Sequence, residues 1–276
     1  QLNEQLLALT GKACYADEIE KTLYNHLAAA QKPDGSAWSY FTNLHGKKAY
    51  TNKQTCCSSS GPRGWASVPS FVYMRAEDGV VVNLFTQSEA MLTLPSGDSV
   101  KIQQETNYPI SGTIHLMVSV SKPAEWTLRV RISQWSHLSG GTAQPGGFYS
   151  IHRRWVGTTP ITIRLDIPAR FEHGKHPDGR YAAIARGPQI LAFDEHFNPS
   201  IHKFDSVWVD SSSLDLTPSQ NMMDEDNFPV YSIQTKCYFA NNFQIKNSTP
   251  KLFLSPFSSA GTKETSYDVW LPTTAQ

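Results

Sequence analysis

The sequence has no excess of charge of either sign and no long apolar run. Its 276 residues carry 24 basic and 24 acidic side chains, spread along the chain rather than collected in runs. This balance argues against a surface for nucleic acid or anionic lipid. No apolar stretch approaches the ~20 residues that span a bilayer, and the N-terminus lacks the basic-then-apolar layout of a signal peptide. We therefore expect a neutral partner such as a sugar, no nucleic acid and no membrane, in a cytoplasmic or secreted protein.

Cysteine is scarce as well. The four cysteines are Cys14, Cys56, Cys57 and Cys237, too few and too scattered for a disulfide framework. Neighbouring Cα atoms lie ~3.8 Å apart, below the ~4.4 Å lower limit of ordinary disulfides. A disulfide between the adjacent Cys56 and Cys57 is therefore not expected, and Cys14 and Cys237 are interpreted as small packed residues.

The pattern of apolar residues predicts helices first and strands afterwards. Apolar residues recur at every fourth position from Tyr15 to Leu27, and a leucine-rich stretch before them ends at Gly11, which predicts a helical hairpin. A weaker helix is predicted at residues 67–75. Beyond Gly79 the chain shows short alternating runs separated by turns, which predict a β-sandwich. These runs are Val80–Phe85, Glu89–Leu94, Val100–Glu105, Thr113–Val120, Trp126–Ile132, Gly147–His152, Ile161–Ile167, Tyr181–Ala185 and Gln189–Phe193.

These patterns describe a mainly β protein with an N-terminal helical segment. We predict a helical part at residues 1–77, a β-sandwich domain at 78–195, and a linker with a smaller C-terminal β domain at 196–276. Within the last part, the polar segment 211–227 is the predicted linker or mobile loop.

The adjacent cysteines are the most unusual feature of the sequence. They occupy a polar stretch, Thr55–Arg63, that contains Gly and Pro and is predicted as a loop. Two thiols on one loop suit a thiophilic ion such as zinc, at ~2.3 Å per bond. Zinc normally takes four ligands, however, and no CxxC or HExxH pattern supplies the others. Spacing alone therefore favours two partly buried structural cysteines over a metal site.

Other side chains near the cysteines have two interpretations each. Trp38 and Tyr40 suit a platform that stacks on a sugar ring, or they pack in a core. His45 suits a hydrogen bond to substrate, or it lies in a surface loop. Glu89 and Glu105 resemble a carboxylate pair in number only, because both fall in predicted sandwich strands and are expected to face solvent.

Short motifs follow one another along the chain, beginning with Leu9–Lys12, Tyr15–Asp17 and Leu23–Leu27. The ordered series resembles glycoside hydrolase family 127, the β-L-arabinofuranosidase family. The motifs cover nearly the whole chain, and the cysteine pair falls where the family has its own Cys-Cys pair. They are Leu9–Lys12, Tyr15–Asp17, Leu23–Leu27, Cys56-Cys57, Asp78-Gly79 with Val82–Phe85, Gln104–Pro109, Leu128–Ile132 with Trp135, Arg186–Pro188 and Val269–Pro272.

The resemblance implies a fold, a reaction and a cofactor. The fold would be the remnant of an (α/α)6 catalytic barrel, followed by a β-sandwich and a smaller C-terminal β unit. By position, Cys56 would be a zinc-bound nucleophile and Cys57 a further zinc ligand. The enzyme would hydrolyse L-arabinofuranosides with retention of configuration, through two displacements.

The sequence also departs from the family. The family's remaining zinc ligands, a glutamate and a cysteine, and its general-acid glutamate lie upstream of the region where this chain begins. We therefore expect an incomplete chain that is inactive by itself. The loop after the pair, Ser58–Arg63, differs from the Pro-Pro-Asn of some members, so substrate preference is open. The alternative is a non-catalytic β-sandwich module that binds or supports carbohydrate and carries a relict cysteine loop, for which no zinc would be needed.

Overall fold

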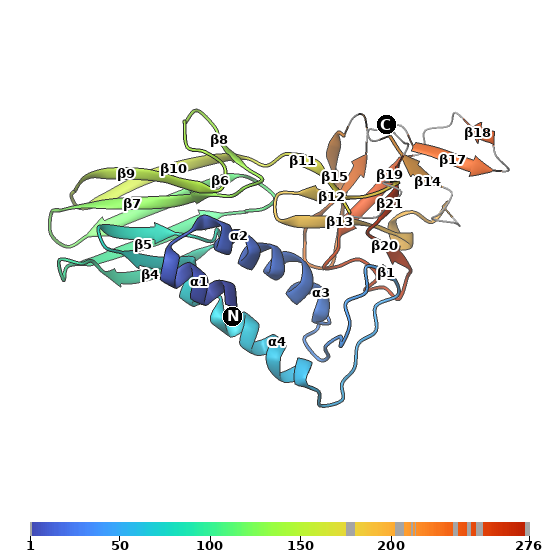
Figure 1. Cartoon of the computed structure of the whole chain (residues 1–276), viewed down its shortest axis with the longest axis horizontal. Coiled ribbons are helices and arrows are strands. Elements are labelled where there is room, and N and C mark those ends of the chain that lie inside the picture. Colours follow the sequence, from blue (N-terminus) through green and yellow to red (C-terminus); the bar gives the residue numbers. More distant parts are fainter. Residues whose placement is uncertain are drawn as a thin grey trace. The chain divides into compact units, whose positions relative to one another are not determined.

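The structure is a computed structural model that describes residues 2–174, 180–201, 207–210, 212, 214–233, 237–241, 244–246 and 251–273. Helices come first in the chain and strands follow (Figure 1), which confirms the predicted mainly β fold with an N-terminal helical segment. The chain divides into two compact units, residues 1–21 with 63–168 and residues 22–62 with 169–276. No described helix is long and apolar enough to cross a bilayer.

The first unit begins with the predicted helical hairpin. Helices α1 (Leu2–Thr10) and α2 (Ala13–Lys21) are separated by Gly11, whose φ is 62°. The Gly11 N–H donates to the Leu7 carbonyl at 2.8 Å. This left-handed end is the usual way in which glycine terminates a helix, because glycine has no Cβ to clash.

Nine strands of the first unit form the predicted β-sandwich. One sheet has the order β2-β3-β7-β9 and the other β4-β5-β6-β10-β8. Every second residue along β5 and β6 is buried, as expected for strands with one face on a core. The strands are β2 (Tyr73–Ala76), β3 (Gly79–Val82), β4 (Ser88–Thr93), β5 (Ser99–Thr106), β6 (Thr113–Val120), β7 (Ala124–Ile132), β8 (His137–Leu138), β9 (Gly147–Trp155) and β10 (Thr158–Asp166).

A buried charge network joins α2 to β7. The Arg131 side chain is fully buried and forms ion pairs with Asp17 and, at 2.8 Å, with Glu20. Tyr108 adds a hydrogen bond to Glu20 at 3.3 Å. Two residues earlier on the same strand, Arg129 forms a partly exposed ion pair at the protein surface. The alternating pattern of β7 would place Arg131 on a solvent-facing side of the strand. Helix α2 covers that position and buries the arginine.

The second unit is built around a nine-stranded sheet. Its main path is β1-β20-β13-β19-β16-β15, and β12 links β13 to β11 and β21. Leu191 and Phe193 lie in an apolar cluster on one face of β13, and Ala192 lies in a second cluster on the other face. The strands are β1 (His45–Gly46), β11 (Ala169–His173), β12 (Tyr181–Arg186), β13 (Gln189–Asp194), β15 (Leu216–Met223), β16 (Pro229–Ile233), β19 (Leu252–Pro256), β20 (Tyr267–Asp268) and β21 (Leu271–Pro272).

Further elements complete the second unit. Strands β14 (Val207–Val209), β17 (Cys237–Asn241) and β18 (Gln244–Lys246) form a separate three-stranded sheet. The helical elements are the π-helix η1 (Thr22–Leu27), α3 (Ala28–Ala30), the start of α4 (Cys56–Ser67), and the 3-10 turn η2 (Glu195–Phe197).

Two local predictions are wrong. The segment 211–227 is not a linker throughout, because it contains β15, which pairs with β16. β15 lies at the edge of its sheet, so its backbone pairs on one side while polar side chains stay hydrated. The helix predicted at 67–75 is only the short α5 (Pro69–Val72), since the chain then continues as β2 and pairs with β3.

The strand pairing also bears on the predicted sandwich domain at 78–195. Its last strands, β11 to β13, join the sheet of the second unit, where β13 pairs with β19 and β20. Strand pairing therefore changes partner after residue 168. The division of the chain into domains at 1–77, 78–195 and 196–276 stays a prediction.

Candidate active site

The cysteine pair opens a helix rather than lying in a loop, which corrects the prediction for Thr55–Arg63. Helix α4 begins at Cys56, and Thr55 precedes it in the capping position. The Thr55 N–H donates to the Ser58 hydroxyl oxygen at 3.0 Å, and the Ser58 N–H points to the Thr55 hydroxyl oxygen at 3.4 Å. This reciprocal arrangement is a capping box. It starts the helix at the cysteines despite the Ser, Gly and Pro that follow them.

The two thiols are close together and free. The sulfur atoms of Cys56 and Cys57 lie 3.9 Å apart, with Cys56 exposed and Cys57 half-buried. Both residues occupy the first helical turn, where unpaired N–H groups and the helix dipole favour negative charge. In the protein without a metal, desolvation raises the pKa of the Cys57 thiol, and its contact with the Cys56 thiol raises it further.

The spacing of the two sulfur atoms suits zinc. Two thiolates bound to one tetrahedral zinc ion at ~2.3 Å lie about 3.8 Å apart, close to the 3.9 Å observed here. The pair would supply two of the four ligands. Within the described ranges, no group of three or more His, Cys, Asp or Glu side chains is placed to hold a metal. The Cys237 side chain lies outside the described residues.

Trp38 packs against the same helix. Its ring lies so close to Gly61 that a Cβ on Gly61 would come within 2.1 Å of ring carbon Cζ3. Gly61 is four residues after Cys57, so the two share one face of α4. Trp38 is buried, as its core-packing interpretation implies, and supports the helix that carries the thiols. No sequence pattern singled out Gly61 for this contact.

The segment that leads into α4 is anchored to the sheet of the second unit. Strand β1 pairs with β20, and the Val269 N–H donates to the Leu44 carbonyl at 2.9 Å. Tyr267 donates a hydrogen bond to the Asn43 carbonyl, and Lys48 donates one to the Ser258 carbonyl. The C-terminal part of the chain therefore fixes residues 43–48, in the segment that precedes the cysteines.

The positions of Tyr40 and His45, the other predicted site residues, do not assign them a role. Tyr40 is 58% exposed and meets Phe41 edge to face at a centroid distance of 4.7 Å. His45 is exposed in β1, opposite Asp268. Neither side chain hydrogen-bonds to a thiol in the part of the chain that the structure describes. Their role toward a substrate stays a prediction.

The predicted surface carboxylates do lie on the sandwich. Glu89 forms an ion pair with Lys101 at 3.0 Å and accepts a hydrogen bond from Gln103 at 2.8 Å. Glu89 and Glu105 belong to β4 and β5, strands of the first unit. Sequence reasoning missed a different feature, the helix cap at Thr55 and Ser58. Its signal was a Thr-x-x-Ser pattern, a weaker form of the Ser/Thr-x-x-Glu/Gln box.

Two family models match the chain as far as residue 167. Residues 1–70 match the family model described as the GH127 catalytic domain of β-L-arabinofuranosidase, and residues 79–167 match the GH127 middle domain. Together the two matches cover more than half of the 276 residues. The chain belongs to glycoside hydrolase family 127. The N-terminal helices and the cysteine pair lie within the residues that match the catalytic-domain model.

Individual relatives agree with this assignment. The chain is 25% identical over 228 residues to a non-reducing end β-L-arabinofuranosidase of Bifidobacterium longum subsp. longum. That alignment covers 71% of this chain and 34% of the relative, so the chain spans about a third of that protein's length.

Solved structures share the fold. A GH127 β-L-arabinofuranosidase from Geobacillus stearothermophilus T6 superposes with a TM-score of 0.82 at 21% identity, covering 99% of this chain and 48% of the other. The GH127 β-arabinofuranosidase BT3674 gives a TM-score of 0.82 at 23% identity, with the same coverage of both chains. The chain therefore spans about half the length of these structures.

Proposed function

We propose that this chain is part of a retaining glycosidase that acts on β-L-arabinofuranosides, with Cys56 as a zinc-bound nucleophile and Cys57 as a zinc ligand. The observation that carries the proposal is the pair of free thiols, 3.9 Å apart, in the capped first turn of α4. The pair lies within the residues that match the family's catalytic domain. Similarity to arabinofuranosidases supports the choice of sugar.

The chemistry follows from the positions of the thiols. A bound zinc ion would supply a positive charge that keeps both thiols deprotonated. The Cys56 thiolate would attack the anomeric carbon, forming a sulfur–carbon bond while the glycosidic carbon–oxygen bond breaks. The departing oxygen would take a proton from a general acid. Water would then give a proton to the same group, now acting as a base, and displace the Cys56 sulfur; the two inversions together retain configuration.

We further propose that the complete catalytic domain is needed for turnover. The chain spans about a third of its Bifidobacterium relative, and the cysteine pair provides two of zinc's usual four ligands. By the motif resemblance, we expect a glutamate, a further cysteine and the general acid to come from a preceding part of the catalytic barrel. We expect the 276 residues assayed alone with zinc to hydrolyse no aryl β-L-arabinofuranoside. Zinc-dependent turnover by this chain alone would contradict that expectation.

The test of the nucleophile is a cysteine series in the enzyme with its complete catalytic domain. Cys56→Ser should abolish turnover, because a serine hydroxyl is a far weaker nucleophile at neutral pH. Cys57→Ser should mainly lower the bound zinc, measured by elemental analysis. Cys14→Ser is the matched control, since Cys14 lies in α2, and it should retain both activity and zinc. Near-normal activity of Cys56→Ser with zinc retained would disprove the assignment.

A further inference from the structure

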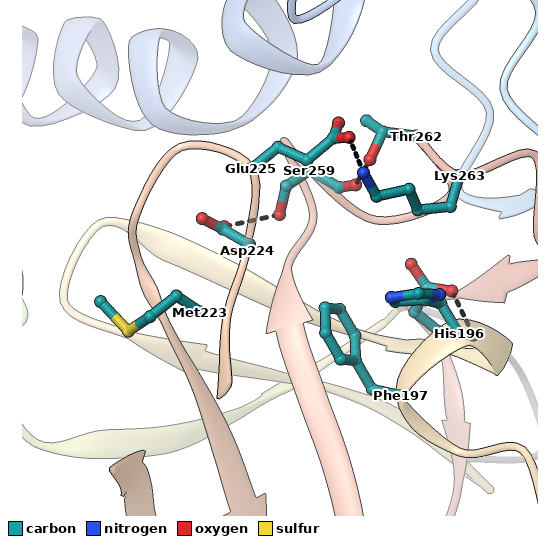
Figure 2. Close-up of a pocket in the computed structure, with 9 residues that line it drawn as sticks. His196, Phe197, Met223, Asp224, Glu225, Ser259, Thr262 and Lys263 are labelled. Atoms are coloured by element: carbon teal, nitrogen blue, oxygen red, sulfur yellow. Dashed lines mark hydrogen bonds and ion pairs between the residues drawn. The ribbon is translucent and has the colours of Figure 1, made fainter. Parts of the chain in front are cut away.

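We propose that the second unit carries a binding site for one ring of a neutral sugar, in a pocket separate from the cysteine pair. The pocket has a volume of about 210 Å³ and is formed by three turns (Figure 2). The first turn follows β13 and carries His196 and Phe197. The second follows β15 and carries Glu225, and the third follows β19 and carries Lys263. None of the lining residues belongs to α4.

Two buried carboxylates hold these turns in place. Asp194 accepts hydrogen bonds from the His196 N–H at 2.9 Å, the Gly261 N–H at 2.8 Å and the Thr265 hydroxyl at 2.7 Å. It therefore ties the first turn to the third. Because its partners are mainly backbone groups, the turns are held at fixed positions.

The second buried carboxylate, Asp224, ties the remaining turn to the same framework. It accepts hydrogen bonds from the Phe228 N–H at 2.7 Å, the Asp226 N–H at 2.9 Å and the Ser259 hydroxyl at 2.7 Å. The pocket is therefore preorganised by hydrogen bonds between its three turns. Preorganisation lowers the cost of ordering the protein when a ligand binds.

The same hydrogen bonds argue against a metal ion as the ligand. Both oxygens of Asp194 and both oxygens of Asp224 already accept bonds from N–H or O–H groups. Those donors occupy three of the roughly four lone-pair sites of each carboxylate, which leaves few of the roughly six to eight oxygen ligands that a calcium ion takes. The ligand must therefore bind through the side chains at the mouth of the pocket.

The side chains at the mouth suit a sugar. Phe197 is half-buried and meets the His196 ring edge to face at a centroid distance of 4.8 Å. Met223 also lines the pocket and is 48% exposed, but its side chain lies apart from these rings (Figure 2). The Phe197 ring offers an apolar surface for the C–H face of a sugar ring. Glu225 and Lys263 form an ion pair at the pocket. A carboxylate next to an ammonium matches two neighbouring hydroxyls, one donating and one accepting.

The charge and the volume of the pocket further restrict which ligands can bind. Three carboxylates, Asp194, Asp224 and Glu225, line the pocket against one lysine. This excess of negative charge disfavours phosphates and uronic acids. The volume of about 210 Å³ lies below the ~300 to 1,000 Å³ of pockets that enclose drug-sized ligands. A single neutral ring fits, and the rest of a longer glycan would remain outside.

The experiment is ligand-observed saturation-transfer NMR with the 276-residue chain at neutral pH. The probes are L-arabinose and methyl β-D-galactopyranoside as neutral sugars and galacturonate as the anion. All proteins carry Cys56→Ala and Cys57→Ala, so that the proposed hydrolysis cannot occur during the measurement, and the Phe197 and Glu225 variants below assign the binding to this pocket. We expect at least one neutral sugar to bind with a Kd on the order of 1 mM, and galacturonate roughly tenfold more weakly.

Two variants and one control identify the pocket. Phe197→Ala and Glu225→Gln should each weaken the neutral sugar roughly tenfold. Glu225→Gln keeps the shape of the side chain, so a folding defect in Phe197→Ala does not decide the outcome. Phe41→Ala, at an aromatic that is 70% exposed and outside the pocket, should leave binding unchanged. Absence of binding to the parent, equal binding by Glu225→Gln, or loss of binding in Phe41→Ala would overturn the proposal.

Discussion

At the scale of single residues, two arginines on one strand show how much position matters. Arg129 and Arg131 are two residues apart on β7, so both lie on the same side of the strand. Arg129 makes a two-pronged ion pair with Asp78 in a partly exposed place, while Arg131 is fully buried between Asp17 and Glu20. Both guanidinium groups pair with carboxylates, and they differ in that α2 buries Arg131 but not Arg129.

Removing each arginine should therefore have different consequences. Arg131→Met leaves two buried carboxylates without their cation, and we expect a loss of about 3 to 5 kcal/mol in the free energy of unfolding. Arg129→Met, the matched control, should cost less than about 1 kcal/mol, because its ion pair is hydrated. Urea denaturation of both variants measures the difference. Equal costs would show that the buried network contributes no more than the surface pair.

Gly61 is the second residue whose size is decisive. A methyl group there would lie 2.1 to 2.4 Å from three atoms of the Trp38 ring. We expect Gly61→Ala to cost about 1 to 3 kcal/mol from overpacking, more than the ~1 kcal/mol that alanine gains in a helix. Reaction of the thiols with a chromogenic disulfide should also change in rate, because the ring supports the helix that carries them.

A double variant tests the cause. Trp38→Phe makes room for the methyl group, so Trp38→Phe with Gly61→Ala should cost less than the two single changes added together. Strict additivity of the unfolding free energies would contradict a direct clash between ring and methyl.

At the scale of elements, the short strand β1 and the residues around it fix the segment that precedes α4, the helix of the cysteines. Lys48 lies just after β1, donates to the Ser258 carbonyl and sits 5.7 Å from the centre of the Phe257 ring. Burial lowers the pKa of Lys48 to about 8, although the carboxylates of Asp226 and Asp194 act in the opposite direction. A charged lysine is thus held partly out of water to secure this segment.

This burial predicts a pH dependence of stability. The unfolded chain keeps the Lys48 proton up to its ordinary pKa of 10.5, whereas the folded chain releases it near pH 8. Between these values the unfolded state binds more protons, so the free energy of unfolding rises with pH. From pH 8 to 10 we expect the parent to gain on the order of 2 kcal/mol relative to Lys48→Met.

The measurement is urea denaturation of both proteins at several pH values. Taking the difference removes the cysteines and tyrosines that titrate in the same range. Lys47→Met, at the exposed neighbour, should follow the parent at every pH. A Lys48→Met curve parallel to that of the parent would show that Lys48 is equally solvated in both states.

At the scale of the whole molecule, each unit is assembled from segments that are distant in the sequence. The first unit needs residues 1–21 as well as 63–168, and the second needs 22–62 as well as 169–276. In the first unit, α2 brings Ala16 and Ile19 into buried positions and supplies the partners of Arg131. The sandwich alone would lose this cover.

We therefore predict that the sandwich is more stable with its N-terminal helices. Residues 63–168 expressed alone should unfold at a lower urea concentration than the same residues fused through a Gly/Ser linker to residues 1–21. The expected difference is about 2 kcal/mol or more, because burial of one large apolar side chain alone is worth ~1.5 to 3 kcal/mol. Equal midpoints would mean that the helices contribute nothing to this unit.

Most of the local structure could be predicted from the sequence. The alternating runs predicted β3 to β7, β9, β10, β12 and β13 with small errors at their ends, because alternation reflects the two faces of each strand and is local. They did not predict β8 and β11. The hairpin of α1 and α2 was predictable for the same kind of reason, since its apolar period and the glycine break are local signals. The ordered motifs identified the family, and they selected the cysteine pair as the chemical feature, which spacing alone did not.

Which segments meet is known only from the folded chain. That Asp17 and Glu20 neutralise Arg131, and that Trp38 requires a glycine on α4, are contacts between residues far apart in the chain. The sugar pocket likewise joins turns that follow β13, β15 and β19. Local patterns carry no information about such partners, because a strand or helix with a given period can pack against many others. The choice is made by the combined burial, hydrogen bonding and charge pairing of the whole fold.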